Sequence, residues 1–194
     1  MRESYKAPVV PSTGVIEMQF TYANRLMGEC LQRLQDRWSD ENASLAGDTL
    51  RFAHLLTAGI VRHRGCYILR RSQDEWGVDP EGAFTPDGVI PDRSGYEDFA
   101  NHLRVSEFVR PEVPDIGVLG VGVALAEALS LKLRTGFPGV RFRIMVSFRG
   151  RPLGPDDRDF MRDCRVSFHA LRQGEAVIGD LESFHYEAIG IIEV

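Results

Sequence analysis

Cysteine is scarce in this chain of 194 residues, which contains only Cys30, Cys66 and Cys164. The three lie far apart, and no two of them have C-x-x-C spacing. An odd number of cysteines at such distances predicts neither a disulfide framework nor a structural zinc site. We expect buried, reduced thiols, which are typical of a reducing compartment.

A long apolar run is also missing. The longest uncharged stretch, Ile116 to Ala126, has 11 residues and includes three glycines, whereas a membrane-spanning helix takes about 20 apolar residues. The first residues, Met-Arg-Glu-Ser-Tyr-Lys-Ala-Pro, lack the apolar core of a secretory signal. We therefore expect a cytoplasmic protein that is not inserted in a membrane.

The chain has no excess of positive charge. It carries 23 lysines and arginines against 28 acidic residues, a net charge of -5. This balance disfavours a protein that binds nucleic acid over its whole surface, although charges can still segregate to one face. The apolar share of 43% and the charged share of 26% are those of a globular chain. The length fits one domain.

Motifs for catalysis and phosphate binding are missing as well. Gly117, Gly120 and Gly122 open an apolar segment, but the sequence has neither a Rossmann glycine pattern after a strand nor a Walker A lysine. Close packing of a helix against a sheet explains these glycines more simply, at about 1 kcal/mol of helix propensity each. A G-x-S-x-G nucleophile motif is also absent.

The histidines have no zinc-motif spacing; they are His54, His63, His102, His169 and His185. His169 and His185 could meet across a sheet and bind a metal with Asp180 or Glu182, but the spacing does not require this. We predict no metal and no cofactor. Cys164 precedes Arg165, yet strand alternation separates their side chains, so an inert thiol is expected.

The N-terminal half predicts an arm, a strand and two helices. Residues 1–13 have two prolines and no periodicity, which indicates a flexible arm. Residues 15–22 alternate like a strand, and residues 23–40 have helical spacing. A second helix is predicted from Asp48 to Ile60, ending by Gly65.

The middle of the chain is less regular. Cys66 to Leu69 fits either a short buried strand or one more turn of the preceding helix. Residues 73–95 contain three prolines and four glycines and predict a long irregular loop. Residues 96–108 then predict a helix that buries Phe99, Ala100 and Leu103.

The C-terminal half contains the clearest patterns. Asp115 can cap a helix over 116–135 that is apolar nearly all round, as a central buried helix is. Residues 140–149 alternate strictly between apolar and polar side chains, as a half-buried strand does. Residues 164–172 alternate too, although a helix from Pro155 also fits them. A short helical turn over 180–186 and a last strand over 187–194 complete the chain.

This order of elements predicts the α+β class. We expect N-terminal helices and a mainly antiparallel C-terminal sheet packed on the long central helix. Residues 14–194 then form a single domain, interrupted by the loop at 73–95.

Strand parity gathers polar residues on one face of that sheet. Arg141, Arg143 and Arg149 share a face, and Arg165, Ser167 and His169 join them if the two strands are neighbours. Arginine forks match phosphate and carboxylate groups. The alternative is a solvated face whose charge Glu187 and Glu193 neutralise.

The loop at 73–95 is the other candidate surface. It combines acidic residues with Trp76 and Phe84, a combination that suits an interaction hot spot. A solvated loop without a binding role explains the same composition.

Three functions follow from these surfaces. The leading hypothesis is a non-enzymatic accessory protein, such as an immunity- or defence-type partner in a bacterium-like cell, docking through the arginine face or the acidic loop. The alternative is a small enzyme or anionic-ligand binder that uses Arg143, Arg165, Ser167 and His169, with His169 or His185 as general acid–base. A cavity beside His169 favours this alternative, and a flat surface opposes it. Nucleic-acid binding through the basic face comes third.

Overall fold

The computed structural model describes residues 20–36, 53–70, 90, 92–149, 163–175 and 180–194. Its main sheet has the order β1-β7-β5-β6-β4, with every neighbouring pair antiparallel. A separate hairpin pairs β2 with β3. The strands are β1 (Tyr22–Ala23), β2 (Ile60–His63), β3 (Cys66–Leu69), β4 (Leu103–Arg104), β5 (Phe142–Arg149), β6 (Asp163–Ala170) and β7 (Ala188–Glu193). The predicted α+β class is confirmed.

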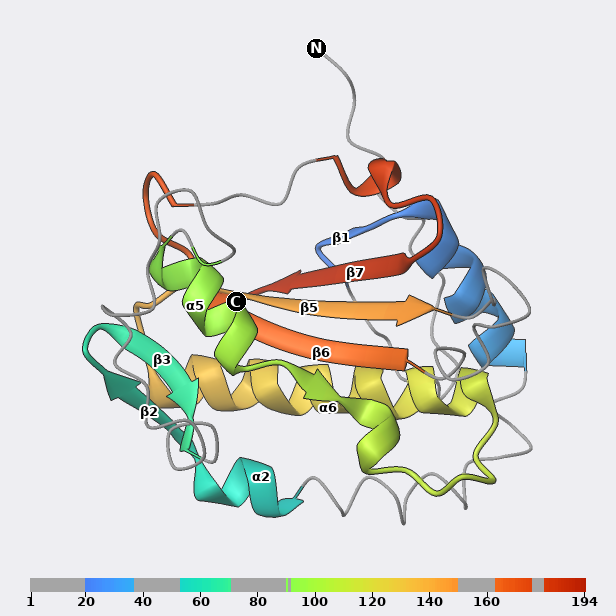
Figure 1. Ribbon diagram of the computed structural model, residues 1–194, viewed down its shortest axis with the longest axis horizontal. Coiled ribbons are helices and arrows are strands. Elements are labelled where there is room, and N and C mark those ends of the chain that lie inside the picture. Colours follow the sequence, from blue (N-terminus) through green and yellow to red (C-terminus); the bar gives the residue numbers. More distant parts are fainter. Residues whose placement is uncertain (1–19, 37–52, 71–89, 91, 150–162, 176–179) are drawn as a thin grey trace.

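The helices differ greatly in length and burial. Residues 25–36 are helical, followed by α2 (Ala53–Ala58), α5 (Arg93–Ala100) and α6 (Asp115–Gly136). Two short 3-10 turns, η2 (Val105–Glu107) and η4 (Leu181–Ser183), complete these elements. Figure 1 shows α6 running along the length of the sheet.

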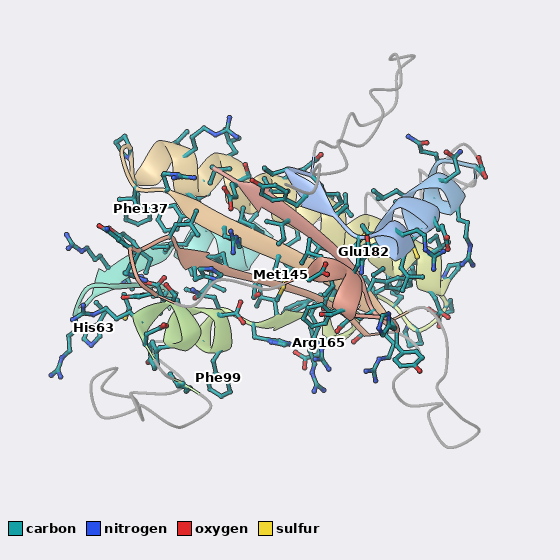
Figure 2. The ribbon with its side chains drawn as sticks, turned by 90° about the horizontal axis from the view of Figure 1, so that it is seen from above. His63, Phe99, Phe137, Met145, Arg165 and Glu182 are labelled. Atoms are coloured by element: carbon teal, nitrogen blue, oxygen red, sulfur yellow. The ribbon has the colours of Figure 1, made fainter. Side chains whose placement is uncertain are left out.

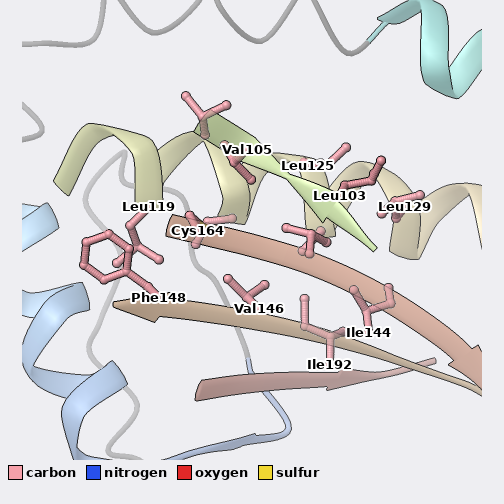
Figure 3. Close-up of a cluster of buried hydrophobic side chains, with 14 of the residues drawn as sticks. Leu103, Val105, Leu119, Leu125, Leu129, Ile144, Val146, Phe148, Cys164 and Ile192 are labelled. Carbon is pink, nitrogen blue, oxygen red and sulfur yellow. The ribbon is translucent and has the colours of Figure 1, made fainter. Parts of the chain in front are cut away.

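The core lies between α6 and one face of the sheet. Alternate side chains of β5 and β6 point into it and are fully buried: Phe142, Ile144, Val146, Phe148, Cys164, Val166, Phe168 and Ala170. Figure 3 shows part of this cluster beneath α6. Burying each large apolar side chain contributes about 1.5–3 kcal/mol. The prediction of a central buried helix is confirmed.

The absence of a side chain at Gly122 lets α6 approach the sheet closely. A Cβ atom there would lie 2.4 Å from the sulfur of Cys164. Within the described residues α6 is also the one helix long and apolar enough to cross a membrane, with a mean hydropathy of 1.8. However, 72% of that stretch is buried inside the protein, as is usual for a core helix.

The side chains of Glu97 on α5 and of Asn101, just after it, join the hairpin to the main sheet. The Glu97 carboxylate accepts hydrogen bonds from the backbone N–H of Tyr67 in β3 and of Ala170 in β6, both at 2.6 Å. Asn101, just after α5, donates to the carbonyl oxygens of Tyr67 and Phe168 at 2.8 and 3.0 Å. Side chains therefore replace the backbone bonds that would otherwise join β3 to β6.

The predicted helix over 96–108 is wrong in extent. The helix α5 begins at Arg93, because the Asp92 side chain accepts a hydrogen bond from Gly95 N at 2.8 Å and caps it. It ends at Ala100, and Leu103 lies in β4. Leu103 is buried as predicted, but Phe99 is 50% exposed, because Tyr96 and Glu97 occupy the inward face.

The predicted end of the second helix is also wrong. Ile60 belongs to β2, and Arg64 and Gly65 form the two-residue turn between β2 and β3. Both have positive φ, 48° and 83°, as a type I′ hairpin turn requires. Gly65 is therefore a hairpin residue and not a helix end, and the strand interpretation of Cys66–Leu69 is confirmed.

The strands around the predicted polar face fall as expected. The pairing of β5 with β6 places Arg143 opposite His169 and Met145 opposite Ser167. The rival helical interpretation is wrong for residues 163–170. The turn at η4 and the last strand are confirmed. The strand predicted over 15–22 is described only near its end, where β1 begins at Tyr22. The arm at 1–13 lies outside the described residues, as does most of the loop at 73–95.

Candidate ligand site on the sheet face opposite α6

The second face of the sheet is not the solvated surface that an alternating pattern suggests. Ser147, Ser167 and His169 point away from α6 and are nevertheless buried. Part of α5 lies over one side of this face, and residues 184–187 lie over the other. Between them is a cavity of about 370 Å³, which we call the trough.

The trough has a floor made by three strands and two walls made by other elements. Its floor residues are Met145, Ser147, Arg165, Ser167, His169 and Ile189. One wall comes from α5 and the residue that follows its cap, with Ser94, Gly95, Asp98 and His102, and the other consists of Phe184 and Glu187. In Figure 2 Met145 lies between the helix that carries Phe99 and the segment that carries Glu182.

Local hydrogen bonds fix both walls. Ser94 Oγ on α5 donates to the carbonyl oxygen of Ala170 in β6 at 3.0 Å. Across the trough, Asn24 donates to the Glu187 carbonyl oxygen at 2.8 Å and accepts from Ile189 N at 3.0 Å. One wall is thus tied to β6, and the other is tied to Asn24, the residue that follows β1.

Asp98, Ser167 and His169 form a polar cluster in the trough. Ser167 Oγ donates a hydrogen bond to Asp98 Oδ1 at 2.6 Å. The same carboxylate oxygen lies 3.7 Å from His169 Nδ1. Burial raises the pKa of Asp98, but His169 and Ser167 lower it by more, so the pKa lies below its usual value. Asp98 is therefore an ionised carboxylate beside the imidazole at neutral pH.

His169 is the unusual member of this cluster. It is only 6% exposed, and neither ring nitrogen has a hydrogen-bond partner in the part of the chain that the structure describes. Buried polar groups are nearly always hydrogen-bonded, so an exception calls for an explanation. The imidazole lies among the residues that line the trough.

The geometry limits the chemistry available. The Ser167 hydroxyl donates to Asp98 and not to the imidazole, so the cluster lacks the serine–histidine contact of a hydrolase triad. Burial and the nearby Glu97 raise the pKa of the Cys66 thiol to about 11, which keeps it a thiol. Among the described residues no group of histidines, cysteines and acids is arranged to hold a metal.

Three of the four arginines predicted on this face, Arg141, Arg143 and Arg149, do not line the trough. Arg143 donates to Glu193 Oε1 through Nη2 at 2.6 Å and Nε at 3.2 Å, and Arg141 Nη2 lies 3.3 Å from Oε2 of the same residue. Glu193 thus pairs with both arginines, as the alternative interpretation anticipated for this residue. Arg149 ends β5 outside the trough lining.

The other predicted residues divide clearly. Arg165, Ser167 and His169 do line the trough, whereas His185 is exposed in a turn and does not. Trp76 and Phe84 lie outside the described residues. Asp98 was missed by the sequence reasoning, although Ser94 and Asp98 are four residues apart and so share one side of α5.

The fold and the trough define an α+β protein with a buried histidine in the floor of a cavity. The chain belongs to the Uncharacterized protein PM0498 family, whose model matches residues 22–194. No curated protein and no solved structure matches the chain.

Proposed function

We propose that the trough binds a small polar molecule, and that His169 is the residue that recognises it. The observation that carries this proposal is the buried imidazole without a hydrogen-bond partner among the described residues, placed in the floor of a cavity. A buried polar group that lacks a partner destabilises the protein by about 1–3 kcal/mol. A ligand that bonds to the ring removes that cost.

The size and composition of the trough support this function. Its volume of about 370 Å³ falls in the range of roughly 300–1,000 Å³ that is usual for ligand pockets. Met145, Phe184 and Ile189 supply apolar surface, and a few polar groups converge beside them. Apolar lining with a small number of placed polar groups is the usual make-up of such a site.

The pairing of His169 with Asp98 adds a capacity for proton transfer. The carboxylate lies on the Nδ1 side of the ring, at 3.7 Å. A carboxylate there favours a proton on Nδ1 and leaves Nε2 to accept or donate a proton. His169 can therefore act as a general acid–base towards a bound substrate, with Asp98 orienting it.

A thermal-shift screen tests the binding function. We expect at least one compound from a panel of small acids, amines and neutral polar molecules to raise the melting temperature. A ligand at 100 times its Kd adds about 2.7 kcal/mol of stability. His169→Gln should abolish the shift, and His185→Gln, at an exposed histidine outside the trough, should retain it. Equal shifts in both variants would contradict the role of His169.

A protein partner is a second candidate function, favoured by aromatic side chains on the segment that forms one wall. Phe184 is 40% exposed and Tyr186 is 69% exposed, and exposed aromatics are enriched at binding hot spots. A native pull-down from the source cells should then yield a stoichiometric companion. Tyr186→Ser should release it, with the melting temperature unchanged. A companion retained by that variant would move the interface elsewhere.

A further inference from the structure

Acidic groups outnumber fixed cations around the trough. Asp98 lines one wall and Glu187 the other, while Arg165 belongs to the floor. The remaining titratable groups of the lining are the imidazoles of His102 and His169, and histidine carries a charge only when it is protonated. The fixed charges of the lining are therefore two carboxylates and one guanidinium, and Arg165 has interactions of its own besides. Among the described residues, the lining is left with an excess of negative charge.

Asp98 keeps one carboxylate oxygen for a ligand. Its Oδ1 atom accepts the Ser167 hydroxyl at 2.6 Å and lies 3.7 Å from His169 Nδ1, whereas Oδ2 accepts no hydrogen bond from a residue that the structure describes. The side chain is 37% exposed, so a molecule in the trough can reach it. The carboxylate is ionised at neutral pH, because burial raises its pKa by less than His169 and Ser167 lower it. Such an oxygen forms its strongest hydrogen bonds with cationic donors.

The opposite wall has the same preference. The backbone carbonyl of Glu187 accepts a hydrogen bond from Asn24 at 2.8 Å, but its carboxylate has no partner within the described part of the chain. Phe184 lies on the same wall and is 40% exposed, and the face of an aromatic ring attracts a cation. Met145 and Ile189 add apolar surface at the floor. Carboxylates beside apolar surface suit an organic cation.

We infer that the ligand of the trough is a small organic amine, whose ammonium group binds Asp98 and whose apolar body covers Met145, Phe184 and Ile189. This inference rests on the proposed function and names the ligand class of the same site. An ammonium group has three N–H donors and no acceptor, and a neutral imidazole offers one acceptor nitrogen. The amine therefore matches Asp98 Oδ2 and the His169 ring, which has no hydrogen-bond partner among the described residues.

Three probes of similar size test the charge of the ligand: benzylamine, benzyl alcohol and benzoate. Isothermal titration calorimetry is run at about pH 8, where an aliphatic amine is protonated and an ordinary imidazole is neutral. Benzylamine should bind roughly tenfold or more tightly than the other two, because a charge-assisted hydrogen bond replaces a neutral one. Benzyl alcohol or benzoate binding as tightly as benzylamine would overturn the inference, as would failure of benzylamine to bind.

A matched pair of variants tests the head group. Asp98→Asn removes the charge but keeps an oxygen that can accept the Ser167 hydroxyl. It should abolish the preference for benzylamine over benzyl alcohol and leave the affinity for benzyl alcohol nearly unchanged. Glu112→Gln, at an exposed acid outside the trough, should retain the preference. A preference that survives Asp98→Asn would overturn the inference, as would equal weakening of both probes, which indicates general damage to the site.

The variant His169→Gln separates this inference from the function on which it rests. If only benzyl alcohol or benzoate binds, and His169→Gln abolishes that binding, the amine inference fails while the proposed binding function stands. If benzylamine binds with the expected preference and His169→Gln leaves its affinity unchanged, the proposed role of His169 fails instead.

Discussion

Replacing Glu97 by alanine is expected to lower the free energy of unfolding by about 3–5 kcal/mol. The Glu97 side chain is fully buried and forms an ion pair with Arg172. It also accepts the backbone N–H groups of Tyr67 and Ala170. Its removal leaves a largely buried guanidinium and two backbone donors without their acceptor. Urea unfolding with an unchanged m value would measure the loss.

Glu29 provides the matched control for this experiment. It also pairs with an arginine, Arg25, but both side chains are more than half exposed. Exposed pairs contribute about 0–1 kcal/mol, so Glu29→Ala should change stability little. A loss below about 1 kcal/mol for Glu97→Ala would contradict the view that this carboxylate joins the hairpin to the sheet.

A double substitution separates the charge of Glu97 from its hydrogen bonds. Glu97→Leu together with Arg172→Met removes both charges but leaves Tyr67 N and Ala170 N unsatisfied. The double variant should therefore remain less stable than the wild type. Full recovery of stability would mean that only the unpaired charge mattered.

Replacing Gly122 by alanine is expected to destabilise the protein by about 1–3 kcal/mol, although alanine is the better helix former. The added Cβ would lie 2.4 Å from the sulfur of Cys164 and 3.3 Å from a methyl carbon of Val105. Either α6 or the sheet must move to relieve this clash. Thermal or urea unfolding measures the effect.

Two further variants make this second prediction specific. Gly136→Ala lies on the same helix with no atom near its added Cβ, so it should be neutral or stabilising. In a Cys164→Ala background the sulfur is gone, and Gly122→Ala should lose most of its cost, which a double-mutant cycle detects. The same cost with and without the sulfur would contradict the close approach of α6 to β6.

The sequence predicted best where a single period governs a long segment. The alternation over 140–149 and 164–172 identified β5 and β6, because each strand buries one complete face against α6. The apolar character of residues 116–135 identified the central helix for the same reason. These features depend on the burial of many residues in one element, and such burial produces a regular pattern of apolar residues in the sequence.

Features that depend on single distant contacts were not predictable. Glu97 and Asn101 read as ordinary polar residues of a helix, yet they bond to two strands that lie elsewhere in the chain. The predicted helix over 96–108 was too long because the contacts that end α5 before Asn101 come from the strands. The local sequence does not show that Asn101 bonds to those strands. Short caps and turns were also not predicted. The cap at Asp92 was placed in a loop, and Gly65 was taken as a helix end although Arg64 and Gly65 form a hairpin turn.

The candidate site was predictable in part. Parity placed Arg165, Ser167 and His169 on one face, and the structure places them in one cavity. Strand parity does not tell which other segment covers that face. The sequence therefore could not distinguish an open arginine surface from a trough covered by other elements. Asp98 comes from α5, and its contact with Ser167 and His169 exists only in the folded protein.

The most direct test of the account is nuclear magnetic resonance of the His169 imidazole in protein labelled with ¹⁵N-histidine, with the signal assigned by its loss in His169→Gln. On addition of a compound that raises the melting temperature in the thermal-shift screen, we expect the ring nitrogens of His169 to shift and saturate with the ligand, while those of exposed His185 stay unchanged. Signals of His169 that do not move during binding, or that move no more than those of His185, would contradict a ligand site in the trough.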